Sequence, residues 1–347
     1  MVLRQPPSSN TPGITVDLGT EDSALVNANV TLVSTGQSCI VGTGSNQTVT
    51  VRGNASVTGA QYGILLGGPD QTGETVTIDA GASVAGASGG IRILASDAKV
   101  TNAGTVTSTN GAGVFFGGDA DTASQLSNTG AITGKANGVL VRTTDDFTLT
   151  NATGGTIAGT NAFNSTGGSD DTIVNTGALN GNVRLGSGDD VYRGQTGTVT
   201  GTVFGGRGND TITTGKGSET IDGGSGNDRL RGGLDADNLP GGTGADRFIF
   251  ASTLDSTGTA SDTIKDFSSD DEDKVSLRQI DANTANAGNQ AFTFIDEAAF
   301  SGKAGELRAE TTVAGTLVQG DVNGDRTADF AILFTDVTGL EAQDFVL

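Results

Sequence analysis

Short apolar segments recur along the chain, and glycine, asparagine or threonine bounds each of them. Within a segment, apolar and polar residues alternate, which is the pattern of a strand with one buried face. The first apolar residues of successive segments lie 18 to 27 residues apart, and the interval shortens toward the C-terminus. Such a period is typical of a solenoid rather than a sandwich. The aligned residues are Ile40, Ile64, Ile91, Val114, Val139, Phe163, Val183, Val203, Ile221 and Leu239.

This pattern predicts an all-β fold, a right-handed parallel β-helix that narrows into a β-roll. Residues 1–22 are expected to be an N-terminal tail, and residues 23–204 to form turns of three short strands each. Residues 205–249 would form the roll, with two strands per turn. In residues 250–347 glycine becomes rarer, which favours an antiparallel cap over the last turn. The strands expected in this cap are residues 262–267, 291–295 and 329–334.

From Gly205 to Asp246 the chain repeats itself every nine residues, with glycine at positions one, two and four, an acid at position six and an apolar residue at position eight. We expect these glycines to adopt positive φ and to turn carbonyl oxygens toward one point, to which the acid adds an anionic oxygen. Calcium takes six to eight oxygen ligands in irregular geometry. We therefore predict calcium sites formed by Gly205, Gly206, Gly208, Asp210, Gly215, Gly217, Glu219, Gly223, Gly224, Gly226, Asp228, Gly232, Gly233, Asp235, Asp237, Gly241, Gly242, Gly244 and Asp246.

The repeats resemble the repeat-in-toxin (RTX) nonapeptides of secreted bacterial proteins. Residues from about 205 to 347 are similar to the C-terminal β-roll and secretion domain of the serralysin metalloproteases. This resemblance implies that two nonapeptides form one turn and that several calcium ions lie between loops stacked on the same side. Asp210, Asp228 and Asp246 would then share one side of the roll. Glu219 and Asp237 would share the other.

The second of these sides departs from the family pattern at three positions. Glutamate replaces aspartate at Glu219, Thr214 replaces the first glycine of its repeat, and Asp235 stands where glycine is expected. These departures predict a weaker row of calcium ligands on this side. We retain Asp235 among the candidate ligands.

The acidic position continues upstream of the nonapeptides. Asp171 and Asp190 lie in register with Asp210, at steps of 19 and 20 residues. Gly186 and Gly188 precede Asp190 as in the repeats, so we predict calcium at these residues as well. For the earlier acids of residues 117–121 and 145–146, and for the loop from Asp321 to Asp329, metal binding and a merely solvated loop both remain open.

The composition narrows the range of partners. Forty acids against nineteen bases give a net charge of −21, which argues against nucleic acid or an anionic membrane surface as a partner. A highly charged chain with 5% aromatic residues is expected to be disordered until calcium neutralises it. The lone Cys39 excludes an internal disulfide, and no segment approaches the ~20 apolar residues of a membrane span.

Both ends of the chain bear on export. Residues 1–13 lack the apolar core of a cleavable signal peptide. The last four residues, Asp344 to Leu347, resemble the terminal tetrapeptide of proteins exported by type I secretion. That resemblance implies the type I secretion machinery as a partner and an extracellular location. Folding on calcium suits this route, because the cytosol holds far less calcium than the ~10⁻⁴ to 10⁻³ M that extracellular modules need.

Histidine is absent from the chain, which excludes the zinc site of the serralysins and any histidine-based triad or dyad. We therefore assign no catalytic residue, and expect a non-enzymatic structural, adhesion or surface role. A polysaccharide lyase or related glycan-active β-helix is the alternative, with an extracellular polysaccharide or cell surface as partner. A flat ice- or crystal-binding face with threonine rows such as Thr48, Thr50, Thr105 and Thr107 is a third hypothesis. The residues considered as a lyase base are Tyr62, Arg92, Lys99, Arg142 and Arg184, which are scattered along the sequence.

Overall fold

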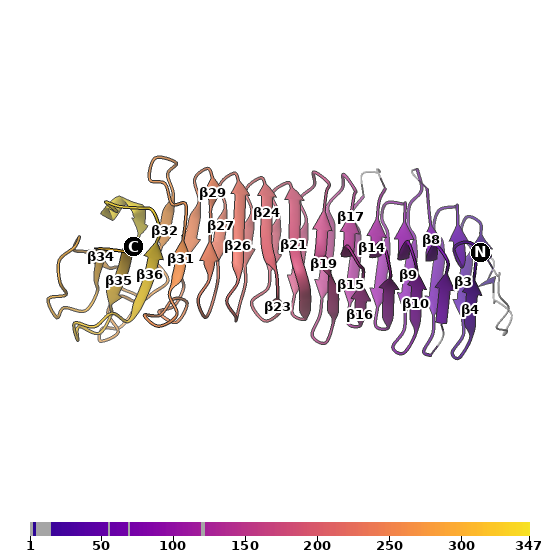
Figure 1. The fold of residues 1–347 in the computed structure, drawn as a ribbon, viewed down its shortest axis with the longest axis horizontal. Helices are drawn as coiled ribbons and strands as arrows, with labels where there is room; N and C mark the ends of the chain where they lie inside the picture. Colours follow the sequence, from indigo (N-terminus) through magenta and orange to yellow (C-terminus); the bar gives the residue numbers. More distant parts are fainter. Residues whose placement is uncertain (1–2, 5–14, 55, 69, 119–121) are drawn as a thin grey trace. The chain divides into compact units, whose positions relative to one another are not determined.

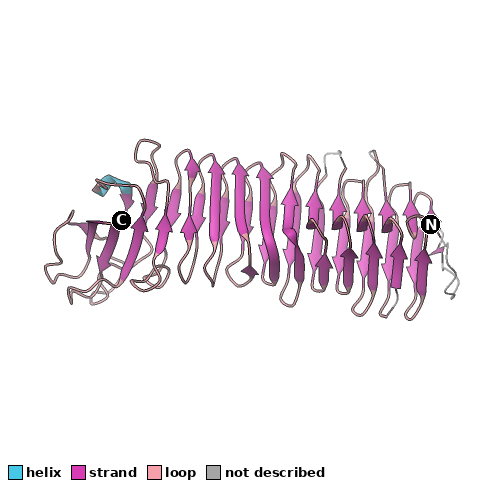
Figure 2. Ribbon diagram, viewed as in Figure 1, coloured by secondary structure: helices cyan, strands magenta, loops and turns pink. Residues whose placement is uncertain are grey.

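The computed structural model describes residues 3–4, 15–54, 56–68, 70–118 and 122–347, and nearly all of its regular structure is β-strand (Figure 2). The chain divides into two compact units. The N-terminal unit comprises the residues up to Tyr192 together with Gly197–Gly201, and the C-terminal unit comprises Arg193–Thr196 and Thr202–Leu347. In the described ranges, no helix is long and apolar enough to cross a membrane.

Turns of the N-terminal unit stack through parallel strands in register (Figure 1). One ladder begins with β1 (Leu3–Arg4) and consists of the strands that open each turn. Because successive strands pair without slippage, residues at one position of the turn form a straight column. The further strands are β3 (Ser23–Val26), β6 (Thr48–Val51), β9 (Thr75–Ile78), β12 (Lys99–Asn102), β15 (Ser124–Asn128), β18 (Phe147–Asn151), β20 (Thr172–Asn175) and β22 (Val191–Arg193).

Two further strands complete each turn, as the sequence predicts. The second strands are β4 (Thr31–Ser34), β7 (Ser56–Gly59), β10 (Ser83–Gly86), β13 (Thr105–Ser108) and β16 (Ala131–Thr133). The third strands are β2 (Val16–Leu18), β5 (Ile40–Gly42), β8 (Tyr62–Leu66), β11 (Gly89–Ile93), β14 (Ala112–Phe116) and β17 (Asn137–Val141). The predicted apolar alignment is confirmed from Ile40 to Val139, because each residue pairs with the next in register.

The prediction of three separate strands in every turn up to residue 204 is wrong for two turns. The second and third strands merge there into β19 (Thr156–Ser165) and β21 (Ala178–Ser187), which pair in parallel. Only residues 159–160 lie between the part of β19 that pairs with β16 and the part that pairs with β17. In the preceding turn of the solenoid, three residues, 134–136, connect β16 to β17. At these two residues the strand continues through a register shift instead of turning. The short β23 (Thr198–Val199) pairs with β21.

The interior of the N-terminal unit contains apolar columns and one polar column. Phe116, Phe147 and Phe163 stack with ring centroids 4.8 and 6.0 Å apart. A ladder of asparagines, each no more than 1% exposed, runs beside them, and the Nδ2 of each amide donates to the Oδ1 of the next over 2.8 to 2.9 Å. Every link in this ladder is neutral and hydrogen-bonded. Its members are Asn102, Asn128, Asn151 and Asn175.

The C-terminal unit has two ladders of parallel strands (Figure 1). The first consists of β24 (Thr202–Arg207), β26 (Thr220–Ser225), β28 (Asn238–Leu239) with β29 (Gly242–Thr243), and β31 (Asp262–Ile264). The second consists of β25 (Thr211–Thr213), β27 (Arg229–Arg231), β30 (Arg247–Ile249), β32 (Lys274–Ser276) and β37 (Phe345–Val346). Val203 pairs with Ile221, as predicted.

An antiparallel segment follows, formed by β34 (Glu306–Thr312), β35 (Gly315–Asp321) and β36 (Phe330–Phe334). The strand predicted at 329–334 is confirmed here. Two other predicted cap strands are wrong in direction: β33 (Thr293–Phe294) pairs in parallel with β34, and β31 pairs in parallel with β28 and β36. Residues 262–264 have the same acid, polar, apolar order as residues 237–239, so they add one more rung to the roll. The 3₁₀ helix η1 (Ala342–Asp344) leads into β37.

Candidate calcium sites

The acids at position six form a buried row in the C-terminal unit. Asp210, Asp228 and Asp246 each precede one of the stacked strands β25, β27 and β30, and each is no more than 1% exposed. The backbone N–H of Asp210 donates to Oδ1 of Asp228 over 2.7 Å, and that of Asp228 to Oδ1 of Asp246 over 2.8 Å. The row continues to Asp273, whose Oδ1 accepts from Asp246 N–H over 2.7 Å. We call these four acids the first row.

A second row lies along the other ladder and consists of Glu219, Asp237 and Asp262. Glu219 N–H donates to Oδ1 of Asp237 over 2.8 Å, and Asp237 N–H donates to Oδ1 of Asp262 over 2.9 Å. In both rows, therefore, one carboxylate oxygen is held by the backbone of the preceding turn. The structure places the acids of alternate nonapeptides on the same side.

The other carboxylate oxygen distinguishes these rows from ordinary hydrogen-bonded acids. Oδ2 of Asp237, Asp246 and Asp262 and Oε2 of Glu219 are buried and accept no hydrogen bond. A buried carboxylate oxygen without a donor or counter-charge is energetically unfavourable. A cation between the turns would remove that penalty, and hard carboxylate and carbonyl oxygens are the ligands that calcium prefers. The residues present therefore fit calcium.

The pKa values of these acids change in the direction expected for such rows. Burial, reinforced by neighbouring carboxylates, raises the pKa of Glu219, Asp237 and Asp246 to about 7. The pKa of Asp262 rises to about 8 from the same causes. In the absence of a metal ion these acids would hold protons near neutral pH, because protonation also removes the buried charge.

The glycines of the nonapeptides have two different roles. Those at positions two and four have φ between 100° and 123° in the first-row repeats, which is the predicted left-handed region; they are Gly206, Gly208, Gly224, Gly226, Gly242 and Gly244. In the second-row repeats Gly217 and Gly233 also have positive φ, at 119° and 111°.

The prediction of positive φ at position one is wrong. Gly205, Gly223, Gly232 and Gly241 are absent from the positive-φ residues, and so is Gly215 at position two of its repeat. The reason for glycine at position one is space, because the acid of each repeat folds back across its own loop. A Cβ on Gly205, Gly223 or Gly241 would lie 2.4 Å from Oδ2 of that acid, and one on Gly232 would lie 2.0 Å from Oδ2 of Asp237.

Asp235 is not part of the buried rows. It occupies the position of a glycine with φ of 77°, its side chain is exposed, and Oδ2 accepts from Gly217 N–H over 3.2 Å. Aspartate tolerates this conformation better than most residues, which explains how it replaces glycine. Its carboxylate supports the neighbouring loop from outside.

The N-terminal unit contains the predicted pair Asp171 and Asp190. Asp171 N–H donates to Oδ1 of Asp190 over 2.6 Å, and Oδ2 of Asp171 is buried without a hydrogen-bond partner. Gly186 and Gly188 adopt φ of 117° and 125°, as in the nonapeptides. Burial raises the pKa of Asp171 to about 6, although Ser165, Phe147 N–H and Ser169 oppose the shift through hydrogen bonds.

One turn upstream, the column that contains Asp171 ceases to be acidic. Phe147 occupies the aligned position, and its backbone N–H donates to Oδ1 of Asp171 over 3.0 Å. The turn before has Ser124 there. Asp146 lies one position earlier and is exposed. The column therefore supplies no carboxylate from residues 145–146, and the acids of 119 and 121 lie outside the described residues.

Three acids were missed as candidates. Asp262 and Asp273 extend the second and first rows, and both precede a polar and an apolar residue as the nonapeptide acids do. That order was the available signal. Asp266 accepts from the N–H groups of Gly241 and Gly242 over 2.8 and 2.9 Å and thereby closes the last nonapeptide.

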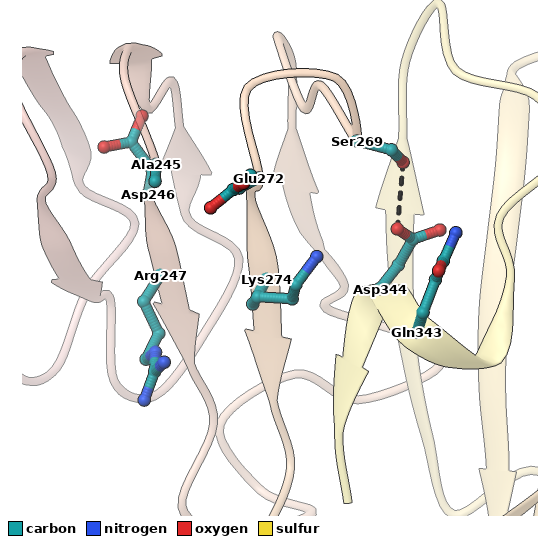
Figure 3. Close-up of a pocket in the computed structure, with 8 residues that line it drawn as sticks. All are labelled: Ala245, Asp246, Arg247, Ser269, Glu272, Lys274, Gln343 and Asp344. Carbon is teal, nitrogen blue, oxygen red and sulfur yellow. Dashed lines mark hydrogen bonds between the residues drawn. The ribbon is translucent and has the colours of Figure 1, made fainter.

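Beyond the first row lies a depression of about 550 Å³ that is lined by charged side chains of both signs, including Asp246, Glu272, Lys274 and Asp344 (Figure 3). Asp344 belongs to the terminal tetrapeptide and is 1% exposed. One of its oxygens accepts from Ser269 Oγ over 2.9 Å, and the other accepts from Glu341 N–H over 2.8 Å. In the folded unit the tetrapeptide therefore ends the 3₁₀ helix η1 and forms the strand β37.

The loop from Asp321 to Asp329 is a hydrogen-bonded hairpin connection. Oδ1 of Asp321 accepts from the N–H groups of Asn323 and Gly324, and Oδ2 accepts from that of Arg326. Oδ2 of Asp329 accepts from Val322 N–H. N–H groups of the loop itself therefore bind both carboxylates.

No group of three or more histidine, cysteine, aspartate or glutamate side chains is placed to hold a metal ion in the part of the chain that the structure describes. Side chains alone would therefore not suffice in either row. A bound ion would need carbonyl oxygens of the glycine loops as well, and a mixture of carboxylate and carbonyl ligands is one that calcium accepts.

Comparisons with known proteins point to one family. The family profile described as peptidase M10 serralysin C-terminal matches residues 117–347, which begins well upstream of the resemblance noted from residue 205. Among solved structures, the AlgE6R3 subunit of the mannuronan C5-epimerase from Azotobacter vinelandii is 22% identical, with a TM-score of 0.24 over 51% of this chain and 77% of that one. The search of curated proteins gave no match. The family profile covers about two thirds of the residues of the chain, so the chain belongs to the RTX-type serralysin C-terminal family.

Proposed function

We propose that the protein is an extracellular calcium-binding protein, exported by type I secretion, whose C-terminal unit folds when it binds calcium. The observation that carries this proposal is the pair of buried acid rows in which Asp237, Asp246 and Asp262 each keep an oxygen without a hydrogen bond. The family is a calcium-binding β-roll family in general. Calcium would supply the positive charge that these rows lack and would join successive turns.

The ligands that we assign to calcium combine side chains with loop carbonyl groups. The acids are Asp210, Asp228, Asp246 and Asp273 of the first row and Glu219, Asp237 and Asp262 of the second. In the N-terminal unit Asp171 and Asp190 would bind an ion in the same way. Irregular loops with carbonyl oxygens suit calcium better than magnesium, which requires near-octahedral geometry.

Calcium-dependent folding is compatible with type I export, with which serralysin-type C-terminal domains are associated in general. Without calcium, the repulsion among 40 acids would keep the chain open for transport. The terminal tetrapeptide would be recognised in that open state, before Phe345 of β37 pairs with Val275 of β32. Far-UV circular dichroism of the purified chain tests the coupling. We expect a cooperative gain of β-structure on adding millimolar calcium after chelation, and an unchanged spectrum would refute the proposal.

We further propose that the role is structural or adhesive rather than enzymatic. The absence of histidine removes the commonest general base, and in the acid rows a backbone N–H holds one oxygen of Asp228 and of Asp237. Extended parallel turns present repeated faces, which suits adhesion to a polymer or a surface.

One observation favours a second function, glycan binding or cleavage. The lyase candidates Tyr62 and Arg92, although distant in sequence, meet in the N-terminal unit. Arg92 Nη1 lies 2.6 Å from Tyr62 Oη, and the guanidinium lies 5.3 Å from the Tyr62 ring and 4.9 Å from the Phe115 ring. Leu140 and Asn137 help to line the same small depression. An aromatic wall beside a guanidinium suits an acidic sugar.

Incubation with acidic polysaccharides separates these functions. Unsaturated products detected by ultraviolet absorbance would support a lyase, whereas retention on the polymer without products would support adhesion. Arg92→Ala should abolish either response. Arg142→Ala is the matched control, because Arg142 is also a surface cation of the N-terminal unit but does not line the depression.

A further inference from the structure

The N-terminal unit buries a second set of acceptor oxygens, upstream of the residues matched by the family profile and outside the nonapeptides. Gln47 and Glu74 are each 0% exposed and directly precede β6 and β9. Thr48 pairs with Thr75 in register, and Thr75 N–H donates to the Gln47 carbonyl over 2.8 Å. The two side chains therefore leave the backbone at the same corner of neighbouring turns.

These side chains carry acceptors to which no other residue donates a hydrogen bond. Neither Oε1 nor Oε2 of Glu74 has a hydrogen-bond partner, and neither does Oε1 of Gln47. The Gln47 amide is oriented by Nε2, which donates to the carbonyls of Leu18 and Gly19 over 3.0 and 3.1 Å. Flipping the amide would set oxygen against oxygen, so Oε1 must remain on the unsatisfied side.

Gln71 adds a fourth acceptor from the loop that leads to Glu74. Its Nε2 donates to the Thr43 carbonyl on the neighbouring turn, and its buried Oε1 has no partner. Three side chains from two stacked loops thus contribute four oxygens without donors. A buried acceptor without a donor is energetically unfavourable, and a carboxylate more so, which favours an occupant beside these oxygens.

The Gln47 loop also repeats the local geometry of the nonapeptide acids. The Gln47 amide folds back onto Gly42, and a Cβ on that glycine would lie 2.0 Å from Oε1. The same relation holds between Asp210 and Gly205, where the distance is 2.4 Å. In both loops a side-chain oxygen fills the space beside the glycine.

We propose that Gln47, Gln71 and Glu74 form a separate cation site, and that its ligand is a hard divalent ion of the calcium class. Only oxygen donors are present, which selects against the softer transition metals. Calcium accepts neutral amide oxygens together with a carboxylate. A site with one carboxylate should bind weakly, in the ~10⁻⁴ to 10⁻³ M range of extracellular modules.

The competing occupant is a proton. Burial, opposed by the Glu74 backbone N–H and reinforced by Asp97, raises the pKa of Glu74 to about 7. A neutral Glu74 could donate its proton to Gln47 Oε1 and satisfy two acceptors without a metal ion. The two occupants predict different results for Glu74→Gln, because glutamine keeps the shape of the side chain and loses the charge. If calcium is the occupant, the variant should bind one ion fewer. If a proton is the occupant, the ion count should not change.

The test uses the full chain, with calcium as the only metal. Native mass spectrometry should count one calcium ion fewer in Glu74→Gln than in the wild type, and no change in Asp97→Asn, which removes a neighbouring exposed acid. Hydrogen exchange should show calcium-dependent protection of residues 43–50 and 71–78 in the wild type, lost in Glu74→Gln but retained at residues 205–246.

Gln47→Glu provides a second variant, for which the added carboxylate should lower the calcium concentration needed for local protection. Equal ion counts in the wild type and Glu74→Gln, or protection of residues 43–50 that ignores calcium, would overturn the proposal in favour of the proton. Because the exchange readout is local, failure of calcium binding at the nonapeptides would leave this test intact.

Discussion

The two units stack parallel turns in the same way but satisfy their buried polar rows differently. In the N-terminal unit, the amides from Asn102 to Asn175 donate and accept along one neutral ladder, with each link at 2.8 to 2.9 Å. In the C-terminal unit the rows are carboxylates, and Asp237 and Asp246 each satisfy one oxygen and leave the other. An amide has both a donor and an acceptor, whereas a carboxylate has only acceptors.

This difference indicates that the chemistry of one buried column decides whether the stacked turns can satisfy their buried polar groups without a bound ion. The N-terminal unit also fills its interior with the rings of Phe116, Phe147 and Phe163, and Phe147 stands in the column that is acidic from Asp171 onward. The first turns of the C-terminal roll have smaller interior residues, Ile212 and Leu230, before Phe248 takes the same position. We therefore expect calcium to control the C-terminal unit far more than the N-terminal one.

Chelation should produce the largest effect. Without calcium, residues 205–276 should lose their protection from hydrogen exchange, because the repulsion within the acid rows has no counter-charge. Residues 99–118 and 122–151 should stay protected, because the asparagine ladder needs no ion. Mass-spectrometric exchange with and without chelator measures both regions in one sample. Uniform loss along the chain would show that the comparison is wrong.

The second largest effect should be a pH dependence in chelator. The pKa values of Glu219, Asp237 and Asp246 are about 7 in the folded unit, above their ordinary 3.8 to 4.5, so these acids take up protons on folding. Their contribution favours the calcium-free folded state below about pH 4 and is lost as pH rises through 7. Asp262 extends the window to about 8.

Circular dichroism in chelator should accordingly show more β-structure at pH 5 than at pH 8. Added calcium should abolish the difference near neutral pH by displacing the protons. The Asp237→Asn variant is the matched control, because it cannot titrate at that position and should reduce the pH dependence. A flat profile between pH 5 and 8 would contradict the role of the buried rows.

The period of the turns could be predicted because a strand ladder must keep its register. The alignment from Ile40 to Val139 needed only the spacing of apolar residues. The acid rows could be predicted as far as the glycines marked them. Asp262 and Asp273 were not predicted because they follow Asp237 and Asp246 by 25 and 27 residues rather than 18, and because residues 250–262 and 265–273 lack the glycine pattern.

Other features depend on contacts that the sequence does not display. The role of Gly205 at position one is to make room for the carboxylate of Asp210, which depends on a side-chain rotamer rather than on backbone propensity. Likewise Tyr62 and Arg92 are 30 residues apart, and only the register of β8 with β11 brings them together. The asparagine-rich turns can be found in the sequence, but the hydrogen bonds between their amides follow only from the stacking of the turns.

Breaking the asparagine ladder should give the third effect. Asn128→Leu leaves Asn102 Nδ2 without its side-chain acceptor and Asn151 Oδ1 without its donor. We expect a loss of about 2 to 4 kcal/mol in the free energy of unfolding of the N-terminal unit, independent of calcium. Thermal and denaturant unfolding with and without chelator measures it. Asn137→Ala removes a half-exposed link to Asn161 and should cost less than about 1 kcal/mol.

The smallest effect should come from removing one charge from one loop. Asp246→Asn keeps the Oδ1 that accepts from Asp228 N–H and replaces only the inner oxygen, so it should raise the calcium concentration at half-maximal folding about tenfold. Asp235→Asn removes an equal charge from an exposed side chain and retains its positive φ, so its shift should stay below about twofold. Calcium titrations followed by circular dichroism compare the two. Equal shifts would mean that calcium binding depends on the total charge of the roll. The buried acid row would then not explain why the two units differ in their dependence on calcium.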